Sequence, residues 1–255
     1  MKKLLLGAIA IAALFTASGA SAADLAARPY TKAAPMVVAT YDWSGFYLGA
    51  NGGGAWSRKC WDLQTLNFLG AIIAPGVAEG CHDATGGVAG GQAGYRWQSA
   101  AWVFGLEAQG DWANLRGSNQ TLFGLFAPGV SNRTKIDAIG LFTGQVGYAW
   151  NNVLWYVKGG AAVTSDKYEG VFLGVAFDSA RETRWGGVVG TGIEFGFTPN
   201  WSFAVEYDHL FMGDRTLTFT SPAGAFSRTD RIRQDVDMIT ARINYRFGGP
   251  VVAKY

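Results

Sequence analysis

The sequence predicts an all-β protein: an eight-stranded antiparallel up-and-down transmembrane β-barrel with an N-terminal signal peptide. Three observations predict this fold. Apolar and polar residues alternate along successive runs from residue 43 onward, the connections between runs are alternately short and long, and aromatic residues recur beside the short connections. Hydrophobic residues make up 49% of the chain, yet no internal apolar run reaches the roughly 18 residues that a membrane-spanning helix needs.

The N-terminus has the features of a secretory signal. Lys2 and Lys3 precede an apolar stretch over residues 4–15, and residues 20–22 (Ala-Ser-Ala) have the small-x-small form of a cleavage site. We therefore expect the chain to be divided into a signal peptide at residues 1–22, a periplasmic lead-in at 23–42, the barrel at 43–247 and a C-terminal extension at 248–255.

The alternation is clearest in residues 201–211, where Trp201, Phe203 and Val205 fall on one face and Ser202 and Glu206 on the other. Short turns and long polar connections then follow one another, which is typical of bacterial barrels with short periplasmic turns and longer outer loops. The expected strands are residues 43–57, 84–98, 101–117, 133–150, 153–168, 182–198, 201–217 and 230–247. The expected long loops are residues 58–83, 118–132, 169–181 and 218–229.

Aromatic residues recur at the strand ends beside the short turns. Indole and phenol rings prefer the interface between membrane and water, because they have an apolar body and a polar tip. A soluble eight-stranded barrel would reverse the two faces, but it gives no reason for aromatic residues at one level. The expected interface residues are Trp43, Tyr95, Trp97, Trp102, Tyr148, Trp150, Trp155, Phe195, Phe197, Trp201, Tyr245 and Phe247.

The two cysteines, Cys60 and Cys81, both fall in the first long connection. In an oxidising exported compartment we expect them to form a disulfide rather than two free thiols. A zinc site is a poor alternative, because His82 is the only nearby histidine and four ligands cannot be assembled. Loss of the two lysines with the signal peptide leaves 19 basic and 19 acidic residues, so charge does not indicate a nucleic-acid partner.

Three segments, AADLAARPYTKAAP, YDWSGFYLGANGG and NYRFGGPVVAKY, resemble the small outer-membrane β-barrel family of alphaproteobacteria, which includes the outer-membrane immunogenic proteins. The likeness covers essentially the whole precursor. It implies a barrel akin to the membrane domain of the OmpA group, often described as porin-like, in the cell outer membrane, with haemin binding in some relatives. We expect outer-membrane lipid, lipopolysaccharide and the outer-membrane assembly machinery as partners, and the sequence predicts no oligomeric state.

The inward-facing positions carry charges of both signs. Buried charges must pair or be hydrated, so we expect an interior network in which Lys158 and Arg242 pair with some of the glutamates. Two interpretations stay open, a narrow water-filled channel and a closed polar plug. The interior of eight strands is just wide enough for side chains to fill it, which favours the plug. The predicted network consists of Arg96, Glu107, Lys158, Glu194, Glu206 and Arg242.

These features predict an outer-membrane barrel that stabilises the envelope and presents surface loops, with a narrow porin-like channel as the open question. The alternative is a surface protein that binds haemin or a host molecule through its loops, with His82 as the weak candidate for an axial ligand. Catalysis is not expected, because the only other histidine is His209, and Glu206 and Asp208 face away from it. We expect no enzyme, no metal site and no resident cofactor.

Overall fold

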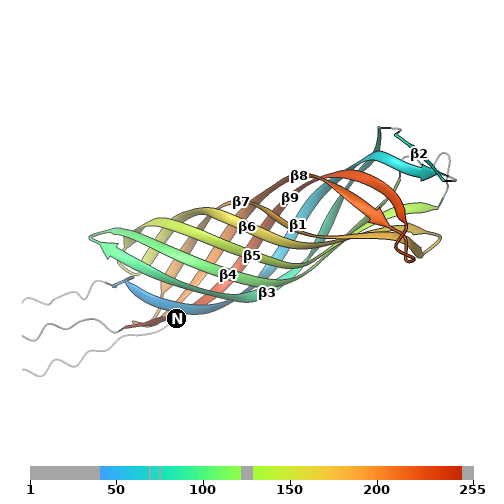
Figure 1. The fold of residues 1–255 in the computed structure, drawn as a ribbon. Helices are drawn as coiled ribbons and strands as arrows, with labels where there is room; N and C mark the ends of the chain where they lie inside the picture. The colour runs from blue at the N-terminus through green and yellow to red at the C-terminus, as the bar shows by residue number, and fades with distance from the viewer. Residues whose placement is uncertain (1–40, 69, 75, 122–128, 249–255) are drawn as a thin grey trace, which may run out of the picture. The chain divides into compact units, whose positions relative to one another are not determined.

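The computed structural model describes residues 41–68, 70–74, 76–121 and 129–248 (Figure 1). These residues form one antiparallel sheet, and none of the described segments is a helix of the length and apolarity needed to span a membrane. The predicted signal peptide, most of the lead-in and residues 249–255 lie outside the described residues. The strands are β1 (Gly45–Phe68), β2 (Ala71–Ile73), β3 (Val77–Ser99), β4 (Trp102–Gln120), β5 (Val130–Trp150), β6 (Val153–Phe172), β7 (Val175–Gly196), β8 (Trp201–Thr220) and β9 (Phe226–Phe247).

The sheet closes on itself because β1 pairs with β3 along one edge and with β9 along the other. The eight predicted strands correspond to the eight long strands of this barrel. The prediction of eight strands is corrected to nine by β2, which falls inside the expected first loop. Pairing of β1 with β3 ends at Leu63, and β2 then lies beside Leu66–Phe68, where it provides backbone partners for the tip of β1.

The long strands extend beyond their predicted bounds at the end opposite the tight turns, by three or four residues in five strands and by seven or more in β1, β3 and β7. They contain 19 to 24 residues, whereas a membrane-spanning strand needs about 9–11. Much of the sequence expected to form loops, such as residues 58–68 and 77–83, is therefore strand. Polar residues on both faces suggested loops, but a strand outside the membrane needs no apolar outer face.

The outer surface of the barrel changes character along the strands. On β1, Phe46 and Trp56 are exposed apolar residues, and Arg58 is the next outward residue. On β9, Ile239 is exposed, and Asp237 precedes it on the same face. We assign the apolar belt at the end with the tight turns to the membrane, and the charged half projects on the side of the long connections, which is the outer side in bacterial barrels.

Two glycines allow tyrosine rings to lie against the inner wall. A Cβ atom on Gly94 would lie 2.5 Å from Tyr47 Oη, and one on Gly192 would lie 2.6 Å from Tyr156 Oη. Any larger side chain at either position would displace a tyrosine from the lumen. Glycine in these strands thus serves close packing across a narrow barrel.

Candidate functional site: the barrel interior

The membrane-spanning half of the interior contains one compact network of charges, and all six predicted members are buried in it. Arg96 Nη2 donates to Glu194 Oε2 at 2.7 Å. Glu194 also accepts hydrogen bonds from the Ser202 hydroxyl and, at 3.0 Å, from Asn244 Nδ2. This carboxylate therefore has a full set of donors although it is 1% exposed.

The second part of the network joins two glutamates to two cations. Arg242 donates to Glu107 at 2.6 Å and to Glu206, and Lys158 Nζ lies 2.5 Å from Glu206. Lys158 also lies 3.2 Å from Asp208, which adds a third carboxylate. The expected pairing of Lys158 and Arg242 thus involves Glu107 and Glu206, whereas Glu194 pairs with Arg96.

Two tyrosines that were not among the predicted members complete the network. Tyr47 Oη donates to Glu107 Oε2 and Tyr156 Oη to Glu206 Oε2, each at 2.6 Å. The inward position of both tyrosines follows from the alternation, so the sequence contains enough information to place their rings in the lumen. Their partners depended on strand register, which the alternation does not specify.

An apolar layer fills the barrel on the outer side of this network. Each of the eight long strands contributes at least one side chain, and every member is at most 4% exposed. Side chains from all around the wall therefore meet across the lumen. A few buried polar side chains lie at the same level, since Ser57 is directly opposite Ala84 and Val236, and Asp111 and Thr164 are opposite Ile139. The apolar layer consists of Ala55, Ala84, Val88, Leu115, Ile136, Ile139, Leu141, Ala162, Val188, Leu210, Met212, Val236 and Met238.

Buried charges reappear in the outer half, partly in segments expected to be loops and partly at the outer ends of the predicted strands. Lys59 Nζ lies 2.8 Å from Asp166 Oδ1 and donates to Gln234 Oε1 at the same distance. Burial lowers the pKa of Lys59 to about 8, although Asp166 opposes the shift. Between this pair and the outer rim, aromatic and aliphatic side chains including Trp61 and Phe219 form another buried cluster.

Near the outer rim, one guanidinium serves three buried carboxylates. Arg228 lies 3.1 Å from both Glu79 and Asp178, and 3.4 Å from Asp230. Burial raises the pKa of Asp230 to about 7, although Arg228 opposes the shift. The outer end is thus held by a charge cluster in which negative groups outnumber the positive one.

The predicted cysteine pair forms a disulfide between directly opposite residues of β1 and β3. His82 follows Cys81 but points into the barrel, where it is 9% exposed. Its Nδ1 lies 2.8 Å from Asn119 Oδ1 and its Nε2 lies 3.1 Å from Thr134 Oγ1. Because both ring nitrogens are engaged and Trp61 beside it is fully buried, these residues do not fit a haemin site.

The aromatic residues near the tight turns face outward, with one exception. Eleven of the twelve predicted interface residues are exposed or half-buried on the outer surface. Trp43 is 2% exposed and lies inside, packed with Val103 and Leu154, and its indole nitrogen donates to the carbonyl of Asn151. Its assignment to the interface was wrong, because Trp43 precedes β1 and turns inward to cover the periplasmic end of the lumen.

A further polar group lies on the outer surface, at the outer edge of the apolar belt. Asp237 accepts hydrogen bonds from Tyr207 at 2.6 Å and, at 2.7 Å, lies beside His209 Nδ1. No serine, threonine or cysteine side chain is hydrogen-bonded to this group among the described residues. In the part of the chain that the structure describes, no cluster of histidine, cysteine, aspartate or glutamate could hold a metal ion.

Comparison with known proteins agrees with this architecture. A family model of the outer membrane protein beta-barrel domain matches residues 8–247. The 31 kDa outer-membrane immunogenic proteins of Brucella melitensis and Brucella suis are each 29% identical over 224 residues, covering 85% of this chain and 90% of the relative. The crystal structure of the outer membrane protease OmpT from Escherichia coli matches with a TM-score of 0.50 and 9% identity, over 80% of this chain and 97% of OmpT. The last likeness concerns the fold alone.

Proposed function

The chain belongs to the outer-membrane β-barrel family, and from this we propose that it is a closed, non-catalytic barrel that stabilises the cell outer membrane and carries a rigid polar platform above it. The platform is the outer half of the long strands, with their connections at its rim. The sheet closes on itself through the pairing of β1 with β9, and β7 pairs with β8 from Gly187 to Gly196 in the membrane half. Such closure is the condition for a stable spanning structure made of strands.

The apolar layer is the single observation that carries this proposal. An ion in the lumen would have to leave water and cross a full cross-section of buried aliphatic side chains, which costs far more than a hydrated path. Water would find few polar partners there, and the polar side chains directly opposite members of the layer include Ser57, Asp111 and Thr164. The interior charges lie on either side of this layer and are paired, so they support a structural plug rather than the lining of a channel.

Haemin binding is less well supported than the structural role. The weak candidate ligand, His82, is buried with both ring nitrogens hydrogen-bonded, and ligation would require breaking these contacts. A catalytic role lacks support because His209 Nδ1 lies beside Asp237, and no serine, threonine or cysteine side chain is hydrogen-bonded to the group of Tyr207, His209 and Asp237 among the described residues.

A deletion strain tests the proposed role. We expect the strain without the gene to become more sensitive to detergents and bile salts, while its rate of uptake of small hydrophilic solutes stays unchanged. Re-expression of the wild-type chain should restore detergent resistance. A fall in solute uptake that the wild-type gene restores, without a change in detergent resistance, would show that the barrel serves as a channel.

A further inference from the structure

Four basic residues form a row across neighbouring strands on the outer surface. Arg116 on β4 is directly opposite Lys135 on β5. Lys135 is opposite Lys167 on β6, and Lys167 is opposite Arg181 on β7. We call these four residues the basic row. Like charges directly opposite one another destabilise a sheet, so an arrangement of this kind needs anions nearby.

The protein supplies only part of the required negative charge. The two middle members have carboxylate partners on their own strands, Asp137 for Lys135 and Glu169 for Lys167. The two end members form no ion pair among the described residues. A cavity of about 510 Å³ opens over the row, and its lining includes a further cation, Arg133. A positive excess therefore surrounds an open hollow.

The opposite side of the barrel is arranged differently at the same level. Arg58 on β1 is directly opposite Asp83 on β3 and Asp235 on β9. Strand β1 lies four strands from β6 in either direction around the barrel. Just outside the apolar belt, the cation on β1 is therefore opposite acidic residues, whereas the cations on β4 to β7 are opposite one another.

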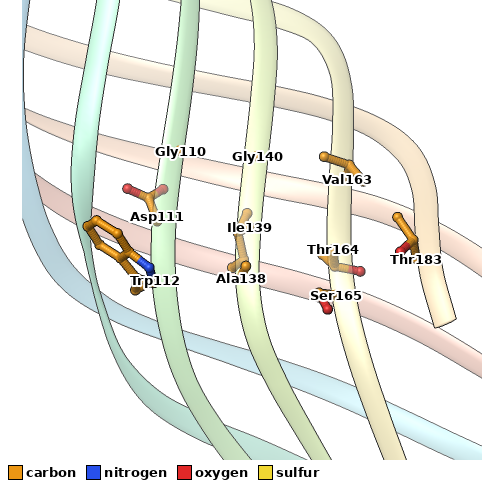
Figure 2. Close-up of a pocket in the computed structure, with 10 residues that line it drawn as sticks. All are labelled: Gly110, Asp111, Trp112, Ala138, Ile139, Gly140, Val163, Thr164, Ser165 and Thr183. Carbon is orange, nitrogen blue, oxygen red and sulfur yellow. The ribbon is translucent and has the colours of Figure 1, made fainter. Parts of the chain in front are cut away.

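A groove lies on the membrane side of the basic row, across β4 to β7 (Figure 2). Its volume is about 440 Å³, and its outward-facing lining is made mostly of small residues. A smaller hollow of about 250 Å³ shares Thr183 with the groove and Lys167 with the cavity over the basic row. The residues that line the groove are Gly110, Asp111, Trp112, Ala138, Ile139, Gly140, Val163, Thr164, Ser165 and Thr183.

We propose that this face binds an anionic saccharolipid of the outer leaflet, that is, lipopolysaccharide. An acyl chain occupies the groove over Gly110 and Gly140, beside Trp112, and the phosphate or carboxylate groups of the sugar lie on the basic row. The order of the two parts agrees with the membrane, since the apolar groove lies in the belt and the cations lie toward the outside. The site rests on the outer-membrane location and does not depend on whether the barrel conducts.

Binding of purified, folded full-length barrel to phosphorylated lipid A, measured in neutral detergent by native mass spectrometry, tests the charged part. The variant Arg116→Gln/Lys135→Gln/Lys167→Gln should bind at least tenfold more weakly than wild type. The matched control Arg58→Gln/Arg231→Gln/Arg233→Gln removes three cations from the opposite side and should bind like wild type. Equal weakening by both variants would show non-specific attraction and overturn the site.

Separate measurements test the groove and the identity of the lipid. A Cβ atom on Gly110 would meet nothing within 4 Å, so Gly110→Leu fills the groove without a clash and should weaken binding several-fold. Gly54→Leu on β1, where a Cβ atom would lie 4.0 Å from its nearest neighbour, the Gly86 carbonyl oxygen, is its control and should have no effect. Dephosphorylated lipid A and phosphatidylglycerol should both bind more weakly than phosphorylated lipid A. Binding of phosphatidylglycerol as tight as that of lipid A would overturn the assignment to a saccharolipid.

Discussion

At the scale of single residues, the stability of the lumen depends on carboxylates that each serve several donors. Glu206 accepts from Lys158, Arg242 and Tyr156 within one buried site. Removing one partner from such a site lowers the free energy of unfolding by more than the ion pair itself contributes to it, because a buried charge is left without compensation.

We therefore expect Glu206→Gln to lower the free energy of unfolding by about 3–5 kcal/mol. Denaturant unfolding in detergent micelles, followed by tryptophan fluorescence, measures this change. Asp83→Asn on the exposed surface is the control and should leave the midpoint of unfolding unchanged. A midpoint for Glu206→Gln equal to that of wild type would contradict the proposed role of the carboxylate as the centre of the network.

Asp230 makes the stability of the outer end of the barrel depend on pH, and the stability should fall as the pH rises. Burial among Glu79 and Asp178, with Arg228 opposing, raises its pKa in the folded state from 3.8 to about 7. A raised carboxyl pKa contributes stability that is fully present below about pH 4 and is lost as the pH rises to about 7. We expect the outer end to exchange its amide hydrogens faster at pH 7 than at pH 5, after correction for intrinsic exchange.

Asp230→Asn replaces the carboxyl with a neutral group and should flatten this dependence. Hydrogen exchange over residues 226–236, compared with residues 240–247 in the membrane, is the measurement. Parallel pH profiles for the wild-type chain and the variant would show that Asp230 does not control the stability of the outer end.

At the scale of elements, alternation predicted the membrane-spanning parts of all eight long strands, because lipid on one side and packed side chains on the other impose a period of two. The outer ends of the strands were missed, most of all in β1, β3 and β7, because polar residues are frequent there and indicated loops. Trp43 was misplaced although the alternation of β1 extends to it. Trp43 is in phase with the inward residues Tyr47 and Asn51, but it was assigned to the interface because it is aromatic and lies near the tight turns.

The disulfide belongs to the same outer extension. Cys60 and Cys81 are paired residues of β1 and β3, above the apolar belt. We expect Cys60→Ser/Cys81→Ser to increase protease cleavage around residues 69–76 several-fold, because the tips of β1 and β3 separate more easily. The heat-modifiable gel mobility of the membrane half should not change. Loss of that mobility would show that the disulfide stabilises the whole barrel.

At the scale of the whole molecule, the interior is a stack of polar and apolar layers. The polar network in the membrane was predicted from inward-facing charges, whereas the apolar layer was not. Several of its members, including Leu115, Ile136 and Met212, lie at irregularities in strand pairing. A bulge shifts the alternation by one residue, so an inward apolar side chain there is indistinguishable in sequence from a lipid-facing one.

Single-channel current across a planar bilayer tests the closed barrel most directly. The wild-type chain, inserted after its folding has been verified by heat-modifiable mobility, should give no discrete current steps. The variant Lys158→Gln/Arg242→Gln should also be silent if it folds, because the apolar layer rather than the ion pairs closes the lumen. Discrete steps from the wild-type chain, with an ion preference that changes in the variant, would contradict the account and make the interior charges the lining of a channel.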